Sequence, residues 1–333
     1  MVALVLRRVL FVVDVPHTVI DDFNRTFGNY YEFSSSKSKQ EAIQLAADAE
    51  ILVMIAPNRD VISSAKKCRW IHALTAGVER FLEVDSIRDN ESMLLTNSSG
   101  IHGIPMSEHL FAMLLVLARR MRPTILKQQE SKWEQPFDVG SPDIFELHGS
   151  TMGIIGLGHI GMEIAKRAKS FGMEVIGTKT NPASLKDQSF AHYVDEVYPP
   201  SGLDTVLKRS DVVVNILPLT ASTRKLFGKE HFSKFKQGSI FVNIGRGETV
   251  VESDLVEALD SKRLRFAALD VFDKEPLPPE SPLWKMESVL VSPHYAGWSP
   301  NYFERAYRIL EENLRRYSSG EKLVNLVDRS RGY

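Results

Sequence analysis

The sequence is poor in cysteine, has no long apolar run and carries no excess of charge of one sign. Cys68 is the only cysteine in 333 residues, so neither an intrachain disulfide nor a cysteine metal cluster can form. The longest apolar candidate, residues 110–118, is far shorter than the roughly 18 residues that span a bilayer. Lysine and arginine number 41 against 42 aspartate and glutamate, which gives no basic character for binding nucleic acid. We expect a cytoplasmic protein with no membrane, nucleic-acid or metal partner.

What the sequence does contain is a repeated strand-then-helix rhythm of apolar segments. Strands are predicted at 9–13, 51–55, 70–74 and 93–96, with helices at 19–27 and 41–49 and a polar loop at 34–39. The rhythm restarts with strands at 152–155, 174–176, 211–217, 239–243, 266–271 and 289–291, and helices at 163–170, 203–208 and 252–259. These strands are mostly unbroken apolar runs, which is typical of parallel sheets covered on both faces.

The segments that join and follow the two series of strands and helices predict how the chain is divided into domains. Residues 107–121 read as one long helix, with Ser107 as its cap, that crosses between domains. A last helix at 301–317 follows Pro300 and is expected to pack back on the first domain. The prediction is a discontinuous first domain, 1–101 with 298–333, and an inserted second domain, 102–297.

A dinucleotide fingerprint follows the first strand of the second series. Gly156, Gly158 and Gly161 lie between that strand and a helix starting near Ile160. In this context the first glycine permits a tight turn, the second lets backbone approach a pyrophosphate, and the third brings helix and strand together. The phosphates would meet the positive end of the helix.

The end of the next strand carries a lysine where an acidic residue usually holds the ribose hydroxyl. Thr178, Lys179 and Thr180 stand about 20 residues beyond the glycines, with no acid among them. A positive charge suits a ribose 2'-phosphate, so we expect NADP in preference to NAD. A solvated strand-end lysine with bound NAD is the alternative.

Three more polar residues each follow a buried strand, where ligands collect in open α/β sheets. His294 follows 289–291 and Glu275 follows 266–271, so the carboxylate can orient the imidazole and favour its protonated form. Arg246, between Gly245 and Gly247, offers a guanidinium fork for a carboxylate. Together they predict proton donation to a carbonyl oxygen while a nicotinamide delivers hydride. Taken singly, His294 and Glu275 are also consistent with structural roles.

Five ordered motifs together resemble the D-isomer-specific 2-hydroxyacid dehydrogenase family: residues 153–161, 217–220, 243–247, 269–277 and 292–297. The match covers nearly the whole chain and is strongest at 149–297. The resemblance implies two doubly wound parallel-sheet α/β domains, a Rossmann-type cofactor domain inserted into a flavodoxin-like substrate domain. It also implies a catalytic set of Arg246, Glu275 and His294, and a homodimer formed through residues 107–120.

The resemblance further assigns contacts. Asp270 would meet the nicotinamide carboxamide, Leu217 and Pro218 the adenine side, and the backbone at Ala76 and Gly77 the substrate carboxylate. The expected substrate contacts are Ala76, Gly77, Arg246 and His294. The expected cofactor contacts are Gly156, Gly158, His159, Ile160, Gly161, Thr178, Lys179, Thr180, Leu217, Pro218, Ile244, Arg246, Asp270, His294 and Gly297.

The expected function is reduction of a small 2-oxo acid, glyoxylate or hydroxypyruvate, to a D-2-hydroxy acid with NADPH. Lys179 departs from the usual acidic residue in the manner of NADP-linked glyoxylate and hydroxypyruvate reductases. One alternative is a phosphoglycerate or other bulkier 2-hydroxyacid dehydrogenase, although we expect no regulatory domain beyond Tyr333. The other is a cofactor-sensing binding protein similar to the C-terminal-binding-protein corepressors, which resemble this family.

Overall fold

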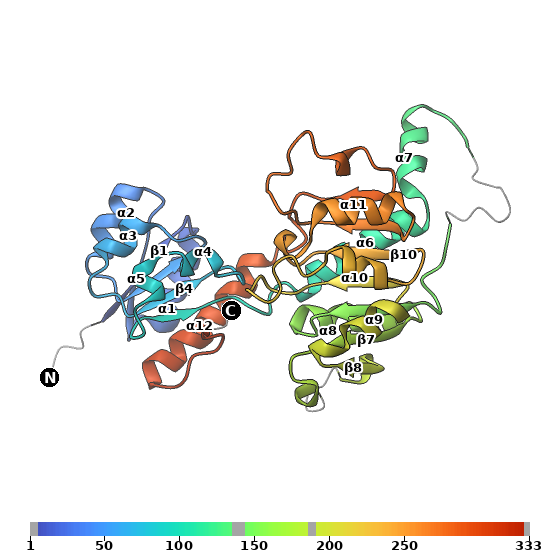
Figure 1. Ribbon diagram of the computed structural model, residues 1–333. Helices are drawn as coiled ribbons and strands as arrows, with labels where there is room; N and C mark the ends of the chain where they lie inside the picture. The colour runs from blue at the N-terminus through green and yellow to red at the C-terminus, as the bar shows by residue number, and fades with distance from the viewer. Residues whose placement is uncertain (1–5, 135–143, 186–190, 330–333) are drawn as a thin grey trace. The chain divides into compact units, whose positions relative to one another are not determined.

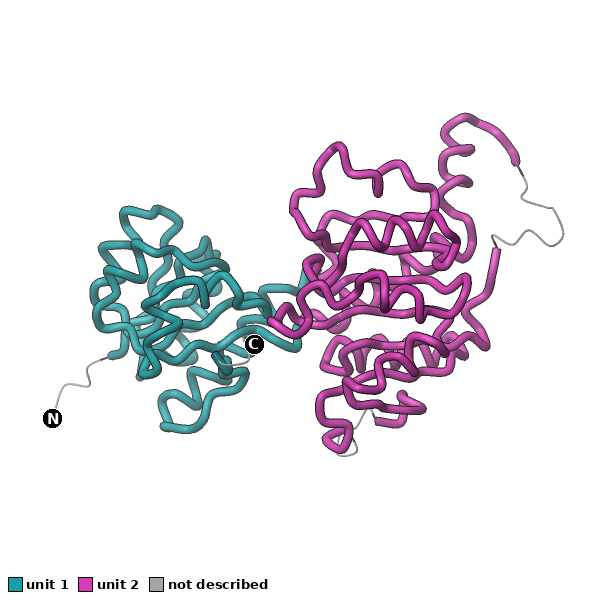
Figure 2. Tube along the Cα trace, viewed as in Figure 1, with its two compact units in different colours: residues 1–101, 300–333 teal, residues 102–299 magenta. Residues whose placement is uncertain are grey.

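The computed structural model describes residues 6–134, 144–185 and 191–329, and the chain forms two compact units (Figures 1 and 2). Unit 1 comprises Met1–Ile101 and Pro300–Tyr333, and unit 2 comprises His102–Ser299. The sequence placed the divisions after residues 101 and 297. Residues 1–5 and 330–333 of the first predicted domain, and 135–143 and 186–190 of the second, lie outside the described residues.

Unit 1 is a parallel five-stranded sheet of order β2-β1-β3-β4-β5. Its strands are β1 Arg7–Val12, β2 Tyr31–Ser35, β3 Ile51–Met54, β4 Trp70–Ala73 and β5 Leu94–Thr96. Its helices are α1 His17–Phe27, α2 Lys39–Ala46, α3 Arg59–Ser64, α4 Glu79–Leu82, α5 Asp85–Arg88 and α12 Tyr302–Ser319. Helix α12, red in Figure 1, joins α1 in the core of one face, where the rings of Phe11 and Tyr307 meet edge-on. Helices α2 to α5 cover the other face.

Unit 2 is a parallel seven-stranded sheet of order β12-β11-β10-β9-β6-β7-β8. Its strands are β6 Thr151–Ile155, β7 Glu174–Thr178, β8 Glu196–Tyr198, β9 Val212–Asn215, β10 Ser239–Asn243, β11 Leu264–Leu269 and β12 Val289–Val291. Its helices are α6 Gly103–Ala118, α7 Met121–Gln129, α8 His159–Ser170, α9 Leu203–Arg209, α10 Lys229–Lys234 and α11 Glu252–Asp260. Helices α6 and α8 pack on one face, and α9, α10 and α11 on the other (Figure 1).

These two parallel-sheet units confirm the predicted fold class. In unit 2 the strand order reverses between β6 and β9: β6 is followed by β7 on one side, and β9 by β10 on the other. In open sheets of this kind, ligands bind beyond the carboxyl ends of the strands at such a reversal. The buried faces of the central strands are almost wholly aliphatic, with Ile154, Val213 and Val242 each fully buried. The continuous apolar runs therefore predicted the sheet correctly.

The prediction of helix α6 was wrong at its start. The helix begins at Gly103, and the hydroxyl of Ser107 donates to the carbonyl of Gly103 at 2.7 Å, inside the helix and not at its cap. Pro105 occupies the first turn, where an amide proton has no helical partner, so proline does not break the helix there. The sequence prediction also omitted β2, β8 and the short helices α3, α4, α5, α7 and α10.

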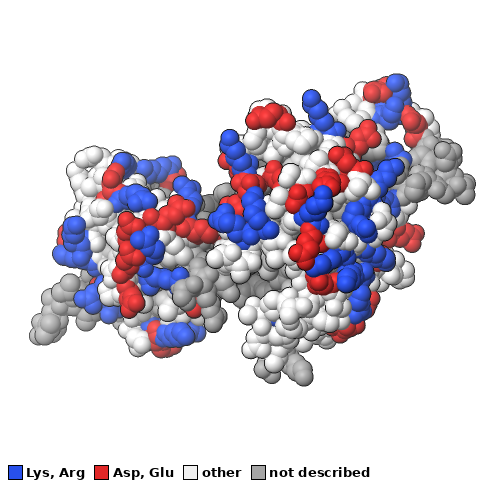
Figure 3. Space-filling view, in the orientation of Figure 1, with Lys and Arg blue, Asp and Glu red and all other residues white. Residues whose placement is uncertain are grey.

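The distribution of charged and metal-binding side chains over the described residues bears on which other partners the chain can have. Acidic and basic side chains are intermixed on the face of each unit that Figure 3 shows. Among the described residues, no three His, Cys, Asp or Glu side chains lie close enough together to hold a metal ion. Within the same residues, no helix combines the length and the apolar character that crossing a membrane requires.

Candidate active site

The glycine turn lies at the reversal point of the unit 2 sheet. Gly156 has a φ of 111°, which L-residues other than glycine rarely adopt, and a Cβ there would lie 3.3 Å from the carbonyl oxygen of Ile216 after β9. A Cβ at Gly161 would lie 2.7 Å from the carbonyl oxygen of Gly156, so α8 approaches the turn closely. A Cβ at Gly158 would meet nothing within 4 Å. Space is therefore left open beside the backbone at the amino end of α8.

That open space fits the pyrophosphate of a dinucleotide. His159 and Ile160 begin α8, and the first amide groups of a helix have no partner inside the helix. They carry the positive end of the helix dipole, which favours an anion. The backbone at Gly156, Gly158 and Gly161 therefore fits a bound diphosphate, and this contact would require no side chain.

Lys179 follows β7 and bends back to the glycine turn. Its Nζ donates a hydrogen bond to the carbonyl oxygen of Leu157 at 2.7 Å, and its side chain is half-buried. The amide of Leu157 in turn donates to the carbonyl of Thr178 at 2.8 Å. The lysine is therefore held beside the turn, and is not a freely solvated strand-end charge.

A buried amide network, which the sequence analysis missed, joins the loops after β9 and β10. Asn215 Nδ2 donates to Asn243 Oδ1 at 3.0 Å and to Thr249 Oγ1 at 2.8 Å. Its Oδ1 accepts from the amide of Leu217 at 3.2 Å, and Asn243 Oδ1 accepts from the amide of Gly245 at 3.2 Å. The available signal was that two apolar strands both end on asparagine, and these asparagines are register partners.

The same network positions the backbone of Arg246. Its carbonyl accepts from Asn243 Nδ2 at 3.2 Å and from Thr249 Oγ1 at 2.6 Å, while its Nη1 donates to the carbonyl of Gly245 at 2.9 Å. A Cβ on Gly247 would collide with the backbone of Phe272 after β11. Glycine is therefore required for the Arg246 loop to pack against the segment that carries Glu275.

His294 and Glu275 form a direct ion pair. His294 Nδ1 lies 2.6 Å from Glu275 Oε2, and Glu275 Oε1 accepts from the amide of Phe272 at 3.0 Å. The imidazole side chain is 52% exposed, and its Nδ1 edge is engaged by Glu275. Since β10, β11 and β12 are neighbours in the sheet, Arg246, Glu275 and His294 come from adjacent strand ends.

The electrostatics of the pair favour a protonated imidazole. The hydrogen bond to Glu275 raises the pKa of His294, against an opposing effect of burial and of the Arg246 charge. Burial by itself would raise the pKa of Glu275, but the hydrogen bonds from His294 and the Phe272 amide outweigh it and lower that pKa. The imidazolium–carboxylate form therefore persists to a higher pH than an isolated histidine would allow.

Asp270 sits behind His294 and is buried, with 2% of its surface exposed. Its Oδ1 accepts from Ser292 Oγ at 2.6 Å, and its Oδ2 accepts from the amide of Ala296 at 3.0 Å. The backbone carbonyl of Asp270 accepts from the amide of His294 at 2.9 Å. This residue thus ties the ends of β11 and β12 together beneath the imidazole.

Several predicted cofactor contacts are placed where the backbone, and not the side chain, would face a ligand. Thr178 and Ile244 are buried, with 4% and 1% exposed, and the side chain of Ile244 belongs to the apolar core. Thr180 and Pro218 are exposed, Leu217 is half-buried, and Gly297 lies against the ring of His102.

The predicted substrate loop belongs to unit 1. Ala76 and Gly77 follow β4, where Thr75 Oγ1 donates to the carbonyl of Gly77 at 2.9 Å and Asn97 Nδ2 donates to the carbonyl of Ala76 at 2.9 Å. Both carbonyls are therefore already hydrogen-bonded to side chains of unit 1.

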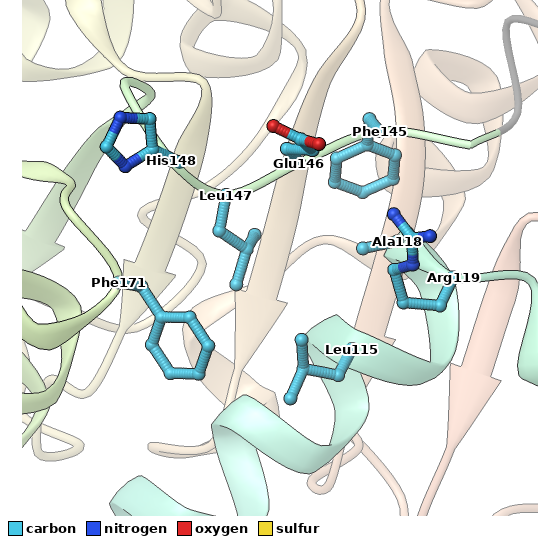
Figure 4. Close-up of a pocket in the computed structure, with 8 residues that line it drawn as sticks. All are labelled: Leu115, Ala118, Arg119, Phe145, Glu146, Leu147, His148 and Phe171. Atoms are coloured by element: carbon cyan, nitrogen blue, oxygen red, sulfur yellow. The ribbon is translucent and has the colours of Figure 1, made fainter.

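A separate cavity of unit 2 contains none of the predicted site residues. It has a volume of about 230 Å³ and is drawn in Figure 4. Its walls come from α6, from the segment before β6 and from the residue that ends α8: Leu115, Ala118, Arg119, Phe145, Glu146, Leu147, His148 and Phe171. The polar groups of the catalytic prediction lie instead at the carboxyl ends of β10 to β12.

Comparison with known proteins gives one family. Residues 111–296 match the family model described as the NAD binding domain of D-isomer specific 2-hydroxyacid dehydrogenases. A glyoxylate reductase of Korarchaeum cryptofilum is 29% identical over 325 residues, which is 96% of each chain. A D-3-phosphoglycerate dehydrogenase of Methanocaldococcus jannaschii is 30% identical over 89% of this chain, but the match spans only 55% of that relative's length.

A solved structure shares the whole architecture. The NADPH-dependent glyoxylate/hydroxypyruvate reductase of Sinorhizobium meliloti, in complex with NADP and sulfate, superimposes with a TM-score of 0.80 at 26% identity. The match covers 98% of this chain and 100% of that one. The similarity therefore extends over both units and not the dinucleotide unit alone.

Proposed function

This chain belongs to the D-isomer specific 2-hydroxyacid dehydrogenase family, and we propose that it reduces a small 2-oxo acid, such as glyoxylate or hydroxypyruvate, to a D-2-hydroxy acid with NADPH. One observation carries the proposal. The His294–Glu275 ion pair, with the Arg246 charge acting on both groups, stands at the strand ends of the unit that binds the dinucleotide. An acid and a carboxylate anchor are the two groups that reduction of a 2-oxo acid requires.

The dinucleotide would be held mainly by backbone. Gly156, Gly158 and Gly161 shape the turn, and the amides of His159 and Ile160 face the diphosphate. Leu217 and Pro218 would border the adenine, and Asp270 the nicotinamide carboxamide. When bound, the nicotinamide supplies a hydride to the carbonyl carbon.

The substrate would be bound through its carboxylate. The guanidinium of Arg246 provides paired donors that match a carboxylate and also polarise the neighbouring ketone. The backbone amides of Ala76 and Gly77 are proposed as the second carboxylate contact. Their loop is suited to it, because Thr75 and Asn97 already hold its carbonyls.

His294 would complete the reaction as general acid. Its Nδ1 is engaged by Glu275, so the proton for the carbonyl oxygen must come from Nε2. In the oxidation direction the same nitrogen accepts the proton. Reduction should consequently have its optimum at a lower pH than oxidation, since the two directions start from opposite protonation states.

NADPH is proposed over NADH because of Lys179. The ammonium group lies beside the glycine turn, held by the Leu157 carbonyl, and no acid follows β7 to repel a 2'-phosphate. The solved Sinorhizobium meliloti relative is described as NADPH-dependent, which supports the same choice.

We also propose an oligomeric state and a cellular location for this chain. A homodimer through the region of α6 follows the family expectation. A cytoplasmic location suits a chain whose only cysteine, Cys68, is half-buried, with a pKa that burial raises to about 11 and hence little reactive thiolate.

The test is a panel of 2-oxo acids assayed with both cofactors. The purified chain should oxidise NADPH with glyoxylate or hydroxypyruvate faster than with bulkier 2-oxo acids, and the product should be the D enantiomer where one exists. A preference for 3-phosphohydroxypyruvate would favour the phosphoglycerate dehydrogenase alternative, which the Methanocaldococcus jannaschii relative supports. Tight NADPH binding without turnover of any 2-oxo acid would favour a cofactor-sensing binding protein.

A further inference from the structure

A histidine outside the predicted site contacts the loop that carries His294. His109 lies in α6, with 13% of its side chain exposed. Its Nε2 is 2.8 Å from the Oγ of Ser292, two residues before His294. Its ring also meets the ring of Tyr295, the residue after His294, edge-on with centroids 4.8 Å apart. One side chain of α6 thus touches the loop on both sides of His294.

The loop that His109 touches is fastened to the carboxylate of Asp270 at three points. Asp270 Oδ1 accepts from Ser292 Oγ at 2.6 Å and from the amide of Tyr295 at 3.2 Å, and its Oδ2 accepts from the amide of Ala296 at 3.0 Å. Between these points His294 has a φ of 50°, a left-handed backbone that costs energy in a residue other than glycine. The surrounding contacts must therefore hold it there.

The hydrogen-bond inventory fixes the direction of the chain of contacts. An ionised carboxylate only accepts, so Ser292 donates its single hydroxyl proton to Asp270. The sulfur of Met113, 3.8 Å from the same hydroxyl, is a much weaker acceptor. His109 must then donate from Nε2 to Ser292 Oγ. Burial lowers the pKa of His109, with the Asp270 charge opposing, which favours the neutral ring, and the bond to Ser292 then requires the N–H to be at Nε2.

We propose that His109 is a positioning residue for His294, acting through the relay His109 Nε2, Ser292 Oγ and Asp270 Oδ1. The relay supports the loop that carries His294 and keeps the imidazole aligned with Glu275. This inference rests on the proposed function, because it takes His294 to be the proton donor. Misplacing a catalytic group by about 1 Å can cost roughly 100-fold in rate, so a loosened loop should be visible in kcat.

The test compares variants of His109 that differ in the ability to donate. His109→Leu removes the donor, His109→Asn keeps polarity but is too short to reach Ser292, and His109→Gln restores an N–H at similar reach. We expect kcat to fall at least tenfold in the Leu and Asn variants with KM and the NADPH Kd changed less than threefold. The Gln variant should keep at least a third of the wild-type kcat. His192→Leu, an exposed histidine of the same unit, is the matched control and should leave kcat unchanged.

A double-mutant cycle separates the relay from a general packing effect. If His109 acts through Ser292, then adding His109→Leu to Ser292→Ala should lower kcat by less than twofold further. Multiplicative losses in the double variant would overturn the proposal. Equal losses in the Gln and Leu variants, or a folded Leu variant within threefold of the wild-type kcat, would overturn it as well. If the Leu variant does not fold, the Asn and Gln pair decides.

A measurement on the cofactor-free protein keeps this proposal distinct from the function. The amides of Tyr295 and Ala296 should exchange with solvent deuterium at least tenfold faster in His109→Leu than in the wild type, and at near wild-type rates in His109→Gln. Faster exchange in His109→Leu, combined with a wild-type protein that reduces no 2-oxo acid, would support the relay and contradict the proposed function. Unchanged exchange beside normal turnover would do the reverse.

Discussion

His294 is the residue on which the chemistry depends, because Nε2 is the ring nitrogen that does not contact Glu275. His294→Gln keeps a polar side chain of similar length but cannot donate an acidic proton. The rate of 2-oxo acid reduction should fall by roughly 100-fold or more, as for loss of a general acid. Stopped-flow measurement of NADPH oxidation at saturating substrate tests this. A loss below tenfold, in a variant with unchanged NADPH affinity, would rule out His294 as the acid.

The second prediction for a single residue concerns Lys179 and the preference for NADPH over NADH. If its ammonium group contacts a 2'-phosphate, Lys179→Ala should weaken kcat/KM for NADPH, relative to NADH, by on the order of 1.5 to 3 kcal/mol. This corresponds to roughly 10- to 150-fold. Lys166→Ala, which removes an exposed lysine from α8 of the same unit, is the control and should not change the ratio. An unaltered NADPH to NADH ratio in Lys179→Ala would show that the lysine only supports the Leu157 carbonyl.

At the scale of an element, the turn between β6 and α8 separates binding from stability. Gly158→Ala adds a methyl group to open space at a backbone conformation that alanine tolerates, so we expect a loss of stability below about 1 kcal/mol. The methyl group would occupy the space proposed for the diphosphate, so we expect at least a tenfold weaker NADPH Kd. Gly161→Ala adds it 2.7 Å from the Gly156 carbonyl and should cost about 1 to 3 kcal/mol of stability. Urea denaturation and NADPH fluorescence titration measure the two effects. A larger loss of stability in Gly158→Ala than in Gly161→Ala would contradict the account. A smaller loss of NADPH affinity in Gly158→Ala than in Gly161→Ala would contradict it as well.

The elements that could be predicted from the sequence are those with long apolar runs. The predictions at 239–243 and 289–291 coincide with β10 and β12, because β10 is buried at every position and β12 is apolar at every position. The prediction failed at β2, an edge strand whose Tyr31–Ser35 segment is half polar. It failed at the start of α6 because Ser107 was interpreted as the cap, whereas its hydroxyl bonds the Gly103 carbonyl inside the helix.

The candidate site was predictable only where a residue type follows a strand. Arg246, Glu275 and His294 could be picked out because each stands just beyond an apolar run. Contacts between distant elements left no such pattern. His109 and Ser292 are 183 residues apart, and only the packing of α6 against the sheet of unit 2 brings them together. The Asn215–Asn243 bond likewise depends on strand register.

At the scale of the whole molecule, acid stability should depend on a buried histidine in unit 1. Burial lowers the pKa of His72 from 6.5 to about 3, so the native state excludes a proton that the unfolded chain binds. The stabilisation is fully present above pH 6.5 and is lost as the pH falls toward 3, by about 1.4 kcal/mol per pH unit.

His72→Gln removes that titration. The variant should be less stable at pH 7, since His72 Nδ1 bonds Thr96 Oγ1 at 2.8 Å, but its free energy of unfolding should decline less steeply below pH 6. Urea unfolding between pH 4 and pH 8 measures both curves. Parallel curves for the variant and the wild type would contradict a neutral buried imidazole.

The central claim is that Glu275 keeps His294 protonated for proton donation, and the pH dependence of kcat/KM for 2-oxo acid reduction tests it most directly. The Glu275 hydrogen bond raises the pKa of His294, so its removal must lower that pKa. In Glu275→Gln the alkaline decline of the reduction rate should move to a lower pH than in the wild type, while Glu280→Gln, an exposed control, leaves it in place. A decline at the same pH in the wild type and in Glu275→Gln would contradict the account.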